Sequence, residues 1–268
     1  MPLGAEVVVH SVRGWMQRHA NTSGKVLVKL DFSNGFNTVS REAVLQATHN
    51  NFPSLSRWAS WCYGNASNLR FGKSSVQSAS GVQQGDPLGP LLFSAAIQPL
   101  AQEARQQVDL AVFYLDYGFL AGDLAAVSSA LSLLHQRWPS DSNSTSRSVS
   151  YCELVAVGQT PVAATQHHFP PPLLFDEQGA DRVVRNFTLL GAPIGDDAFC
   201  GAHTAARAKL AGPLLDHIAE LEDRQIGLRL LKSSRPQNCP ARPNASSSHP
   251  RPVHVLLAPT ARHRGASP

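Results

Sequence analysis

Three short segments of this sequence contain side chains that could do chemistry together. In the first, Asp31 follows an alternating run of apolar residues, and Phe36 lies five residues further along. The second is a glutamine- and glycine-rich run at residues 80–87. The third places Asp116 at a predicted hairpin turn. Each segment alone has an ordinary interpretation, namely a surface acid, a loop that begins a helix, and a turn, so the argument depends on where the fold puts them.

Hydrophobic periodicity predicts the elements that carry these segments. Strands are predicted over 25–32, 110–116, 118–122, 151–157 and 187–194, and helices over 5–18, 88–104 and 123–137. Ser40 and Asp123 are expected to cap the helices that follow them. Residues 38–80 form an insertion after the first strand, with a hairpin over 68–78. The order β-α-β-β-α-β predicts an α+β, ferredoxin-like fold, with an antiparallel sheet and helices on one face.

This topology brings the two acids together. The first strand and the central hairpin of such a fold lie side by side, so Asp31 and Asp116 are expected at the same edge of the sheet. Two facing carboxylates suit a hard divalent cation that takes phosphate oxygens as its other ligands. That is the arrangement needed to join a 3′-hydroxyl to an incoming triphosphate.

In this context the three segments resemble motifs A, B and C of reverse transcriptases of the kind carried by non-LTR retrotransposons. The run QQGDPLGPLLF at residues 83–93 is the most specific of the three. Weaker resemblance extends from residue 4 to about residue 230, and includes Cys152-Glu153-Leu154 and the segment 187–191.

The resemblance implies a right-hand polymerase palm with partial fingers and an RNA-directed DNA polymerase (nucleotidyltransferase) activity. Its cofactors would be two Mg²⁺ ions, and its partners an RNA template, a DNA primer and deoxynucleoside triphosphates. The resemblance assigns the site as follows: Asp31 and Asp116 as catalytic metal ligands, the Phe32 carbonyl as a third donor, Phe36 as the gate against a 2′-hydroxyl, and Gln84 and Gly85 beside nucleotide and template. On sequence alone, Phe36 also fits an ordinary core aromatic.

The departures from the family pattern bear on activity. Tyr117 stands where the family's hairpin has its second aspartate, Tyr151 stands where many relatives have lysine, and Gly35 replaces an alanine. Upstream fingers segments and much of the thumb are not found in the sequence. These departures favour a weakly active or inactive polymerase. The alternatives are a catalytically dead nucleic-acid-binding remnant of a retroelement, and a non-functional fragment that does not fold stably.

The resemblance and the composition together predict three parts. Residues 1–197 are predicted to be partial fingers and palm, 198–232 a helical segment like the start of a thumb, and 233–268 a disordered tail rich in Pro, Arg and Ser. The net charge of +4 belongs to that tail, because its five arginines leave 4 − 5 = −1 for residues 1–232. The tail could bind phosphates, and it equally fits a shifted reading frame.

Other features of the sequence exclude competing classes. Four scattered cysteines without a C-x-x-C pair argue against a disulfide framework or a zinc site, and favour a reducing, intracellular compartment, with the nucleus open if the chain is part of a retroelement. No apolar run suits a signal peptide or a bilayer span, so no membrane partner is expected. Asp196-Asp197 is predicted to be a solvated turn rather than a second carboxylate site. The sequence does not specify an oligomeric state.

Overall fold

The computed structural model describes residues 4–32, 34–138 and 149–233. Except for residue 233, the predicted disordered tail lies outside the described residues. Within the described part of the chain, no helix is both long enough and apolar enough to cross a membrane.

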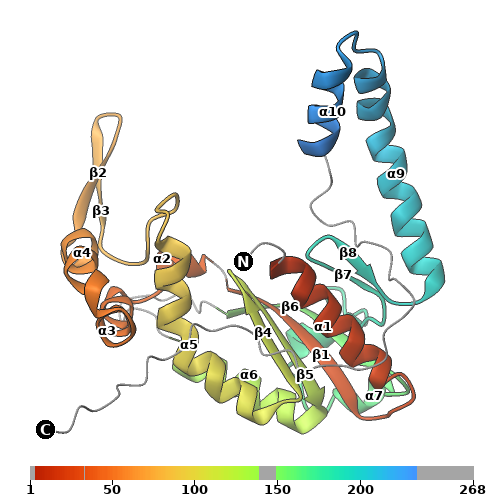
Figure 1. Ribbon diagram of the computed structural model, residues 1–268. Coiled ribbons are helices and arrows are strands. Elements are labelled where there is room, and N and C mark those ends of the chain that lie inside the picture. The colour runs from red at the N-terminus through yellow and green to blue at the C-terminus, as the bar shows by residue number, and fades with distance from the viewer. Residues whose placement is uncertain (1–3, 33, 139–148, 234–268) are drawn as a thin grey trace, which may run out of the picture.

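A four-stranded antiparallel sheet forms the centre of the fold (Figure 1). Its strands are β1 (Lys25–Phe32), β4 (Leu110–Tyr114), β5 (Tyr117–Asp123) and β6 (Val149–Val157), and they lie in the order β4-β5-β1-β6. This is the ferredoxin-like order in which the first strand of the unit lies between the third and the fourth. The predicted α+β class and the position of β1 beside the central hairpin are therefore confirmed.

Each face of the sheet is covered by its own apolar cluster. Because side chains alternate along a strand, Val28 and Leu30 point to one face and Leu27 to the other. Helices α5 (Gly89–Gln107) and α6 (Leu124–Arg137) pack on the first face, as predicted. Helix α1 (Gly4–Arg18) covers the second face, so helices lie on both sides of the sheet once this preceding helix is counted.

The insertion between β1 and α5 forms a lobe beside the sheet, and its buried side chains continue the apolar cluster of the first face. It contains α2 (Gly35–Thr38), α3 (Arg41–Asn51), α4 (Pro53–Tyr63), and the hairpin of β2 (Ser67–Phe71) and β3 (Ser74–Ser78). The hairpin projects away from the sheet (Figure 1). The Ser40 side chain accepts a hydrogen bond from the backbone N–H of Ala43 at 3.4 Å, which confirms the predicted cap.

The chain after β6 forms smaller elements. These are α7 (Val162–Thr165), α8 (Pro171–Leu174), β7 (Phe187–Leu189), β8 (Ala192–Ile194), α9 (Asp197–Ala219) and α10 (Arg224–Ser233). The β7–β8 hairpin packs on the same face of the sheet as α1. Helices α9 and α10 form a hairpin that stands clear of the sheet (Figure 1).

Three details of the prediction are wrong. The strand predicted over 110–116 ends at Tyr114, because Leu115 and Asp116 form a tight turn. The strand predicted over 187–194 is split into β7 and β8 by a turn in which Leu190 and Gly191 have φ of 47° and 83°. Asp123 precedes α6 but makes no side-chain cap. Its carboxylate instead pairs with the Lys25 ammonium at 3.0 Å, because antiparallel register places these two residues opposite each other.

Candidate active site

The sheet brings the two predicted acids to one edge. Asp31 lies opposite Tyr117 in the β1–β5 register, and Asp116 is the residue immediately before Tyr117. The backbone N–H of Phe32 donates to the carbonyl of Asp116 at 2.8 Å, which ties the turn to the end of β1. Neither acid is fully exposed.

The turn that carries Asp116 has an unusual backbone. Leu115 has φ of 54°, a left-handed conformation that costs a residue with a Cβ about 1–2 kcal/mol. Its side chain is 43% exposed, so apolar burial does not explain the conformation. The pairing of β4 with β5 on either side of the turn holds it, and Asp116 is thereby fixed at the sheet edge.

Electrostatics couple the two acids. Partial burial raises the pKa of Asp31 above its ordinary value, and the negative charge of Asp116 raises it further. The ammonium of Lys29 acts in the opposite direction. Lys29 is itself held by Glu153 at 3.2 Å, on the neighbouring strand. A divalent cation bound by both carboxylates would relieve this repulsion between them.

Tyr117 lies directly beside Asp31. Residues opposite each other in an antiparallel pair point to the same face, so the Tyr117 side chain lies on the Asp31 side of the sheet. Its ring is partly buried against the apolar cluster that includes Val12 and Phe119. The position that resembles the family's second aspartate is therefore occupied by a packed aromatic ring.

Phe36 and Gly35 connect this edge to the rest of the site. The Phe36 ring is half-buried and stacks on Phe93, with centroids 4.5 Å apart and planes 12° apart. A Cβ on Gly35 would lie 3.0 Å from the Cβ of Phe32 and 3.3 Å from the Phe93 ring. Glycine is therefore the residue that fits here without displacing the aromatic rings. Phe32 itself is fully buried and stacks on Trp138 at 4.3 Å.

The loop containing Gln84 and Gly85 is anchored at its beginning. The backbone N–H of Gly81 donates to Val39 at 2.9 Å, and that of Val82 donates to Phe36 at 2.7 Å. Gly81 has φ of +69°, and a Cβ there would come within 2.4 Å of the backbone atoms of Phe36 and Asn37. Gln84 and Gly85 are exposed beyond this anchor.

A second anchor holds the end of the loop. The Tyr63 hydroxyl donates a short hydrogen bond to the Asp86 carboxylate. The other carboxylate oxygen of Asp86 accepts from the backbone N–H of Leu88 at 2.9 Å, at the start of α5. Burial is the larger cause and the hydrogen bond to Asp86 the next, and they raise the pKa of Tyr63 to about 12.

Arg41 connects the insertion lobe to this loop, and sequence reasoning did not identify it. Its guanidinium donates to the Gly81 carbonyl at 3.0 Å, the Ser78 carbonyl at 2.8 Å and the Asn65 carbonyl at 3.3 Å. It also donates to the Ser78 hydroxyl and lies over the Tyr63 ring, 5.5 Å from its centroid. One signal was present in the sequence: an arginine in the first turn of a helix opposes the helix dipole, so it needs another role.

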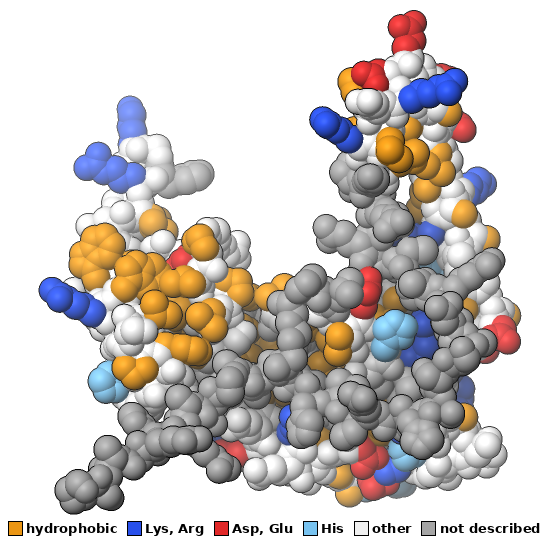
Figure 2. Space-filling model, in the orientation of Figure 1, with side chains coloured by type: hydrophobic (Ala, Val, Ile, Leu, Met, Phe, Trp, Pro, Cys, Tyr) orange, Lys and Arg blue, Asp and Glu red, His pale blue; other side chains and the backbone are white. Residues whose placement is uncertain are grey.

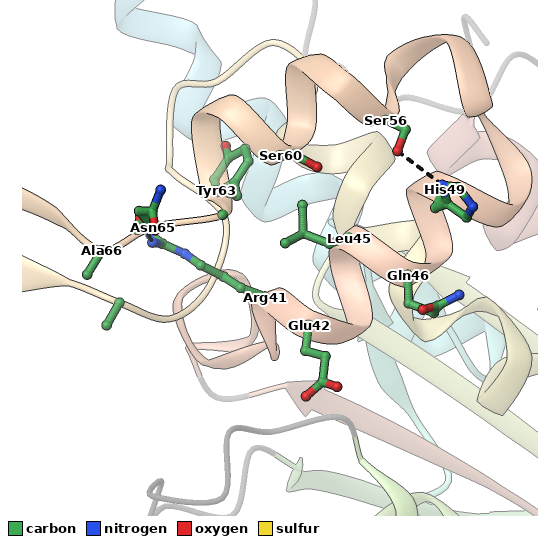
Figure 3. A pocket seen from close by; sticks show the side chains of 12 residues that line it. Arg41, Glu42, Leu45, Gln46, His49, Ser56, Ser60, Tyr63, Asn65 and Ala66 are labelled. Atoms are coloured by element: carbon green, nitrogen blue, oxygen red, sulfur yellow. Dashed lines mark hydrogen bonds between the residues drawn. The ribbon is translucent and has the colours of Figure 1, made fainter.

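A cavity of about 480 Å³ lies elsewhere, between α3 and α4 (Figure 3). Its lining includes Gln46, Ser60 and the hydrogen-bonded pair His49 and Ser56, whose Nδ1 and Oγ lie 3.3 Å apart. None of the six predicted site residues lines it. The structure therefore separates this cavity from the acidic edge.

Asp196 and Asp197 do not form a second acidic site. Asp196 is the N-cap of α9, where its carboxylate accepts from the backbone N–H of Phe199 at 2.8 Å. This bond, together with one from Asn186, lowers the pKa of Asp196. Asp197 begins α9, so the prediction of a solvated turn is wrong for that residue. Among the described residues, no three His, Cys, Asp or Glu side chains are grouped so that they could hold a metal ion.

Comparison with known proteins agrees with the geometry of the site. Residues 7–137 match the family model described as reverse transcriptase (RNA-dependent DNA polymerase). The matched segment spans α1 to α6 and contains Asp31, the loop at 80–87 and Asp116. Comparison with curated proteins gave no match. Residues 7–137 therefore match a reverse transcriptase (RNA-dependent DNA polymerase) domain.

Proposed function

We propose that this chain is a reverse transcriptase domain protein that binds nucleic acid and a divalent cation, with weak or absent RNA-directed DNA synthesis. The observation that carries the proposal is the pairing of Asp31 with Tyr117 across β1 and β5. One carboxylate of the site is in register with a tyrosine where the family resemblance places an aspartate. The scaffold of the site is thus retained without its full set of charges.

The donor set fits one hard cation better than two. Asp31 and Asp116 offer carboxylate oxygens, the ligand type that Mg²⁺ prefers. Within the described parts of the chain, no third acid or histidine joins them. When bound, the cation would neutralise charge on the phosphates of a nucleotide. The role of Asp31 and Asp116 is to hold it at the sheet edge, and that of Phe36 to support the sugar.

Tyr117 supplies little of what an aspartate would. A phenol with its ordinary pKa of about 10 is neutral at neutral pH, so it brings no negative charge. Phosphoryl transfer depends mainly on positioning and charge stabilisation, and losing one preorganised electrostatic group costs about 10²–10³ in rate. We expect a loss of at least that size here.

The insertion lobe offers a surface for nucleic acid. Residues 43–85 contain no Asp or Glu, but do contain Arg57, Arg70 and Lys73. Figure 2 shows basic side chains at the tip of the β2–β3 hairpin. Trp61 on α4 is 83% exposed, and an exposed aromatic ring is a platform on which unpaired bases stack. These features support an RNA template or DNA primer as the partner, with deoxynucleoside triphosphates at Gln84 and Gly85.

Primer extension tests the catalytic part of the proposal. The unaltered chain is expected to extend an RNA-templated DNA primer negligibly, at the same level as an Asp31→Ala control. Robust synthesis that disappears in the control would show that Tyr117 is compatible with catalysis and that the proposed loss of activity is wrong. Tyr117→Asp is the matched gain-of-function variant.

Cation binding is tested without any turnover. Mg²⁺ is expected to raise the melting temperature of the unaltered chain, and to have no such effect on Asp31→Asn. An equal rise in both proteins would place the cation elsewhere.

A second candidate is a nucleic-acid-binding protein without catalysis, derived from a retroelement. Tyr117 favours it, because the change removes charge from the site and leaves the surface of the insertion lobe untouched. Oligonucleotide binding by a chain that neither extends primers nor gains activity as Tyr117→Asp would select this candidate.

A further inference from the structure

The α9–α10 hairpin leaves a large apolar surface uncovered. The two helices meet where Gly227 lies against Ile218, and a Cβ on Gly227 would be 3.7 Å from the Ile218 side chain. Ile218 and Gly227 are the buried positions of the pair among its described residues. The contact between the helices is therefore small, and it leaves their leucines facing outward.

Eight large apolar side chains of this hairpin are at least 40% exposed. They are Leu210 (76%), Leu214, Leu215, Leu221, Ile226, Leu228, Leu230 and Leu231. Figure 2 shows apolar side chains gathered on the hairpin above the sheet. Single exposed leucines are normal on protein surfaces, but eight on one helical hairpin make it a candidate interaction surface.

The charges on the hairpin are separated along its length. Residues 216–223, around its tip, contain Asp216, Glu220, Glu222 and Asp223 and no Lys or Arg, which gives −4. The flanking residues of the two helices, 197–215 and 224–233, contain Arg207, Lys209, Arg224, Arg229 and Lys232 against Asp197 alone, which gives +4. Figure 2 shows acidic side chains at and near the tip, with basic ones beside and below them.

This separation of charge makes two copies of the hairpin complementary when they pack antiparallel. Lys209 in α9 and Glu220, the C-cap of that helix, are eleven residues apart, or about 16 Å at 1.5 Å per residue. That distance exceeds the Debye length of about 8 Å at physiological salt, so the two ends interact little within one chain. Two hairpins packed antiparallel would bring the acidic tip of each to the basic stem of the other. Their leucines would meet between them, as in an antiparallel four-helix bundle.

We propose that the apolar face of α9–α10 binds a second copy of this chain, forming a twofold-symmetric, antiparallel dimer. The inference concerns the oligomeric state, and it stands independently of the proposed catalytic function. Charge complementarity selects this occupant, because a second copy offers a basic stem to the acidic tip and an acidic tip to the basic stem, whereas a nucleic acid offers negative charge alone.

Sedimentation of the full chain tests the proposal. The unaltered protein is expected to sediment as a dimer that dissociates on dilution. Leu210→Glu combined with Leu228→Glu should give a monomer at every concentration. Both positions are exposed, so the fold is expected to survive. Leu69→Glu is the matched control, since Leu69 is 51% exposed on the β2–β3 hairpin, and it should leave the dimer unchanged.

A charge exchange tests the antiparallel arrangement. Chains with Glu220→Lys and Glu222→Lys, and chains with Arg207→Glu and Lys209→Glu, should each be monomeric alone. Mixed together they should form a heterodimer, because each acidic end then meets a basic end of the other chain. A mixture that stays monomeric would overturn the arrangement.

Two further results would overturn the dimer itself. One is an unaltered chain that is monomeric at all concentrations, which would mean that the face does not bind a second copy. The other is a monomer whose affinity for an oligonucleotide falls in the leucine double variant, which would assign the face to nucleic acid.

Discussion

Replacing Arg41 with methionine is expected to lower the free energy of unfolding by about 3 kcal/mol. Arg41 is 6% exposed, and its guanidinium donates to the Gly81 carbonyl in a wholly buried bond. Its other bonds, to Asn65 and Ser78, are partly buried. Methionine fills a similar volume but leaves these acceptors without their donor.

The magnitude follows from the burial of each acceptor. Leaving one buried acceptor unsatisfied costs about 1–3 kcal/mol. Each partly buried bond contributes about 0.5–1 kcal/mol, because water can replace some of it. The sum is about 2.5–6 kcal/mol. The expected loss of about 3 kcal/mol is taken from its lower part, and it is still a large share of the 5–15 kcal/mol that typically stabilises a folded domain. Arg41→Lys should lose less, because it keeps the charge without the fork of donors.

Urea unfolding measures this change, and hydrogen exchange locates it. The amides of Gly81 and Val82 should lose protection in Arg41→Met, because the loop they anchor is held by this side chain. Arg57→Met is the matched control, since Arg57 is exposed on α4, and it should change stability by less than about 0.5 kcal/mol. If Arg41→Met is as stable as Arg57→Met, the lobe and the loop are held together by other contacts.

Three further changes have defined outcomes. Gly81→Ala should lower the free energy of unfolding in urea several-fold more than Gly72→Ala. Both glycines have positive φ, where a residue with a Cβ costs about 1–2 kcal/mol, but only at Gly81 would the Cβ meet backbone atoms. Because the folded pKa of Tyr63 is about 12 against about 10 unfolded, the stability that it contributes is complete below pH 10 and is lost as pH rises towards 12. Tyr63→Phe should remove this alkaline loss, and an unchanged pH profile of unfolding would contradict the assignment. Asp31→Asn should raise the melting temperature measured in a chelator at neutral pH. The reason is that the raised pKa of Asp31 means that the folded state disfavours its charged form. A lower melting temperature would contradict the repulsion between Asp31 and Asp116.

The sheet and its helices were predictable because they depend on local periodicity. Val26, Val28 and Leu30 alternate with Leu27 and Lys29, and this pattern is visible without a partner strand. The order of elements then fixes which strands can be neighbours, so Asp31 and Asp116 could be assigned to one edge. The family motifs pointed to the same residues independently.

Contacts between distant segments were not predictable in the same way. Asp123 has the sequence context of a helix cap, yet strand register gives it Lys25 as a partner nearly a hundred residues away. Arg41 likewise finds its acceptors in two segments that are distant in sequence, at Asn65 and at residues 78–81. The net charge of −1 over residues 1–232 concealed a basic lobe, because a sum over the chain discards position.

The frame of this site and its chemistry depend on different residues. The loop at 80–87 is held by Arg41, Gly81 and the Tyr63–Asp86 bond, and none of these contacts uses a carboxylate at the sheet edge.

Tyr117 contributes to the folded structure around the site, because its ring packs against the apolar cluster beneath α1. An aspartate there would place a second negative charge beside Asp31, whose pKa is already raised by burial and by Asp116. Compared with an aspartate, a tyrosine here therefore removes repulsion and adds apolar packing, and under the proposed function the group that is given up is one needed for catalysis. Selection for a folded, nucleic-acid-binding chain would keep Tyr117, and selection for polymerisation would not.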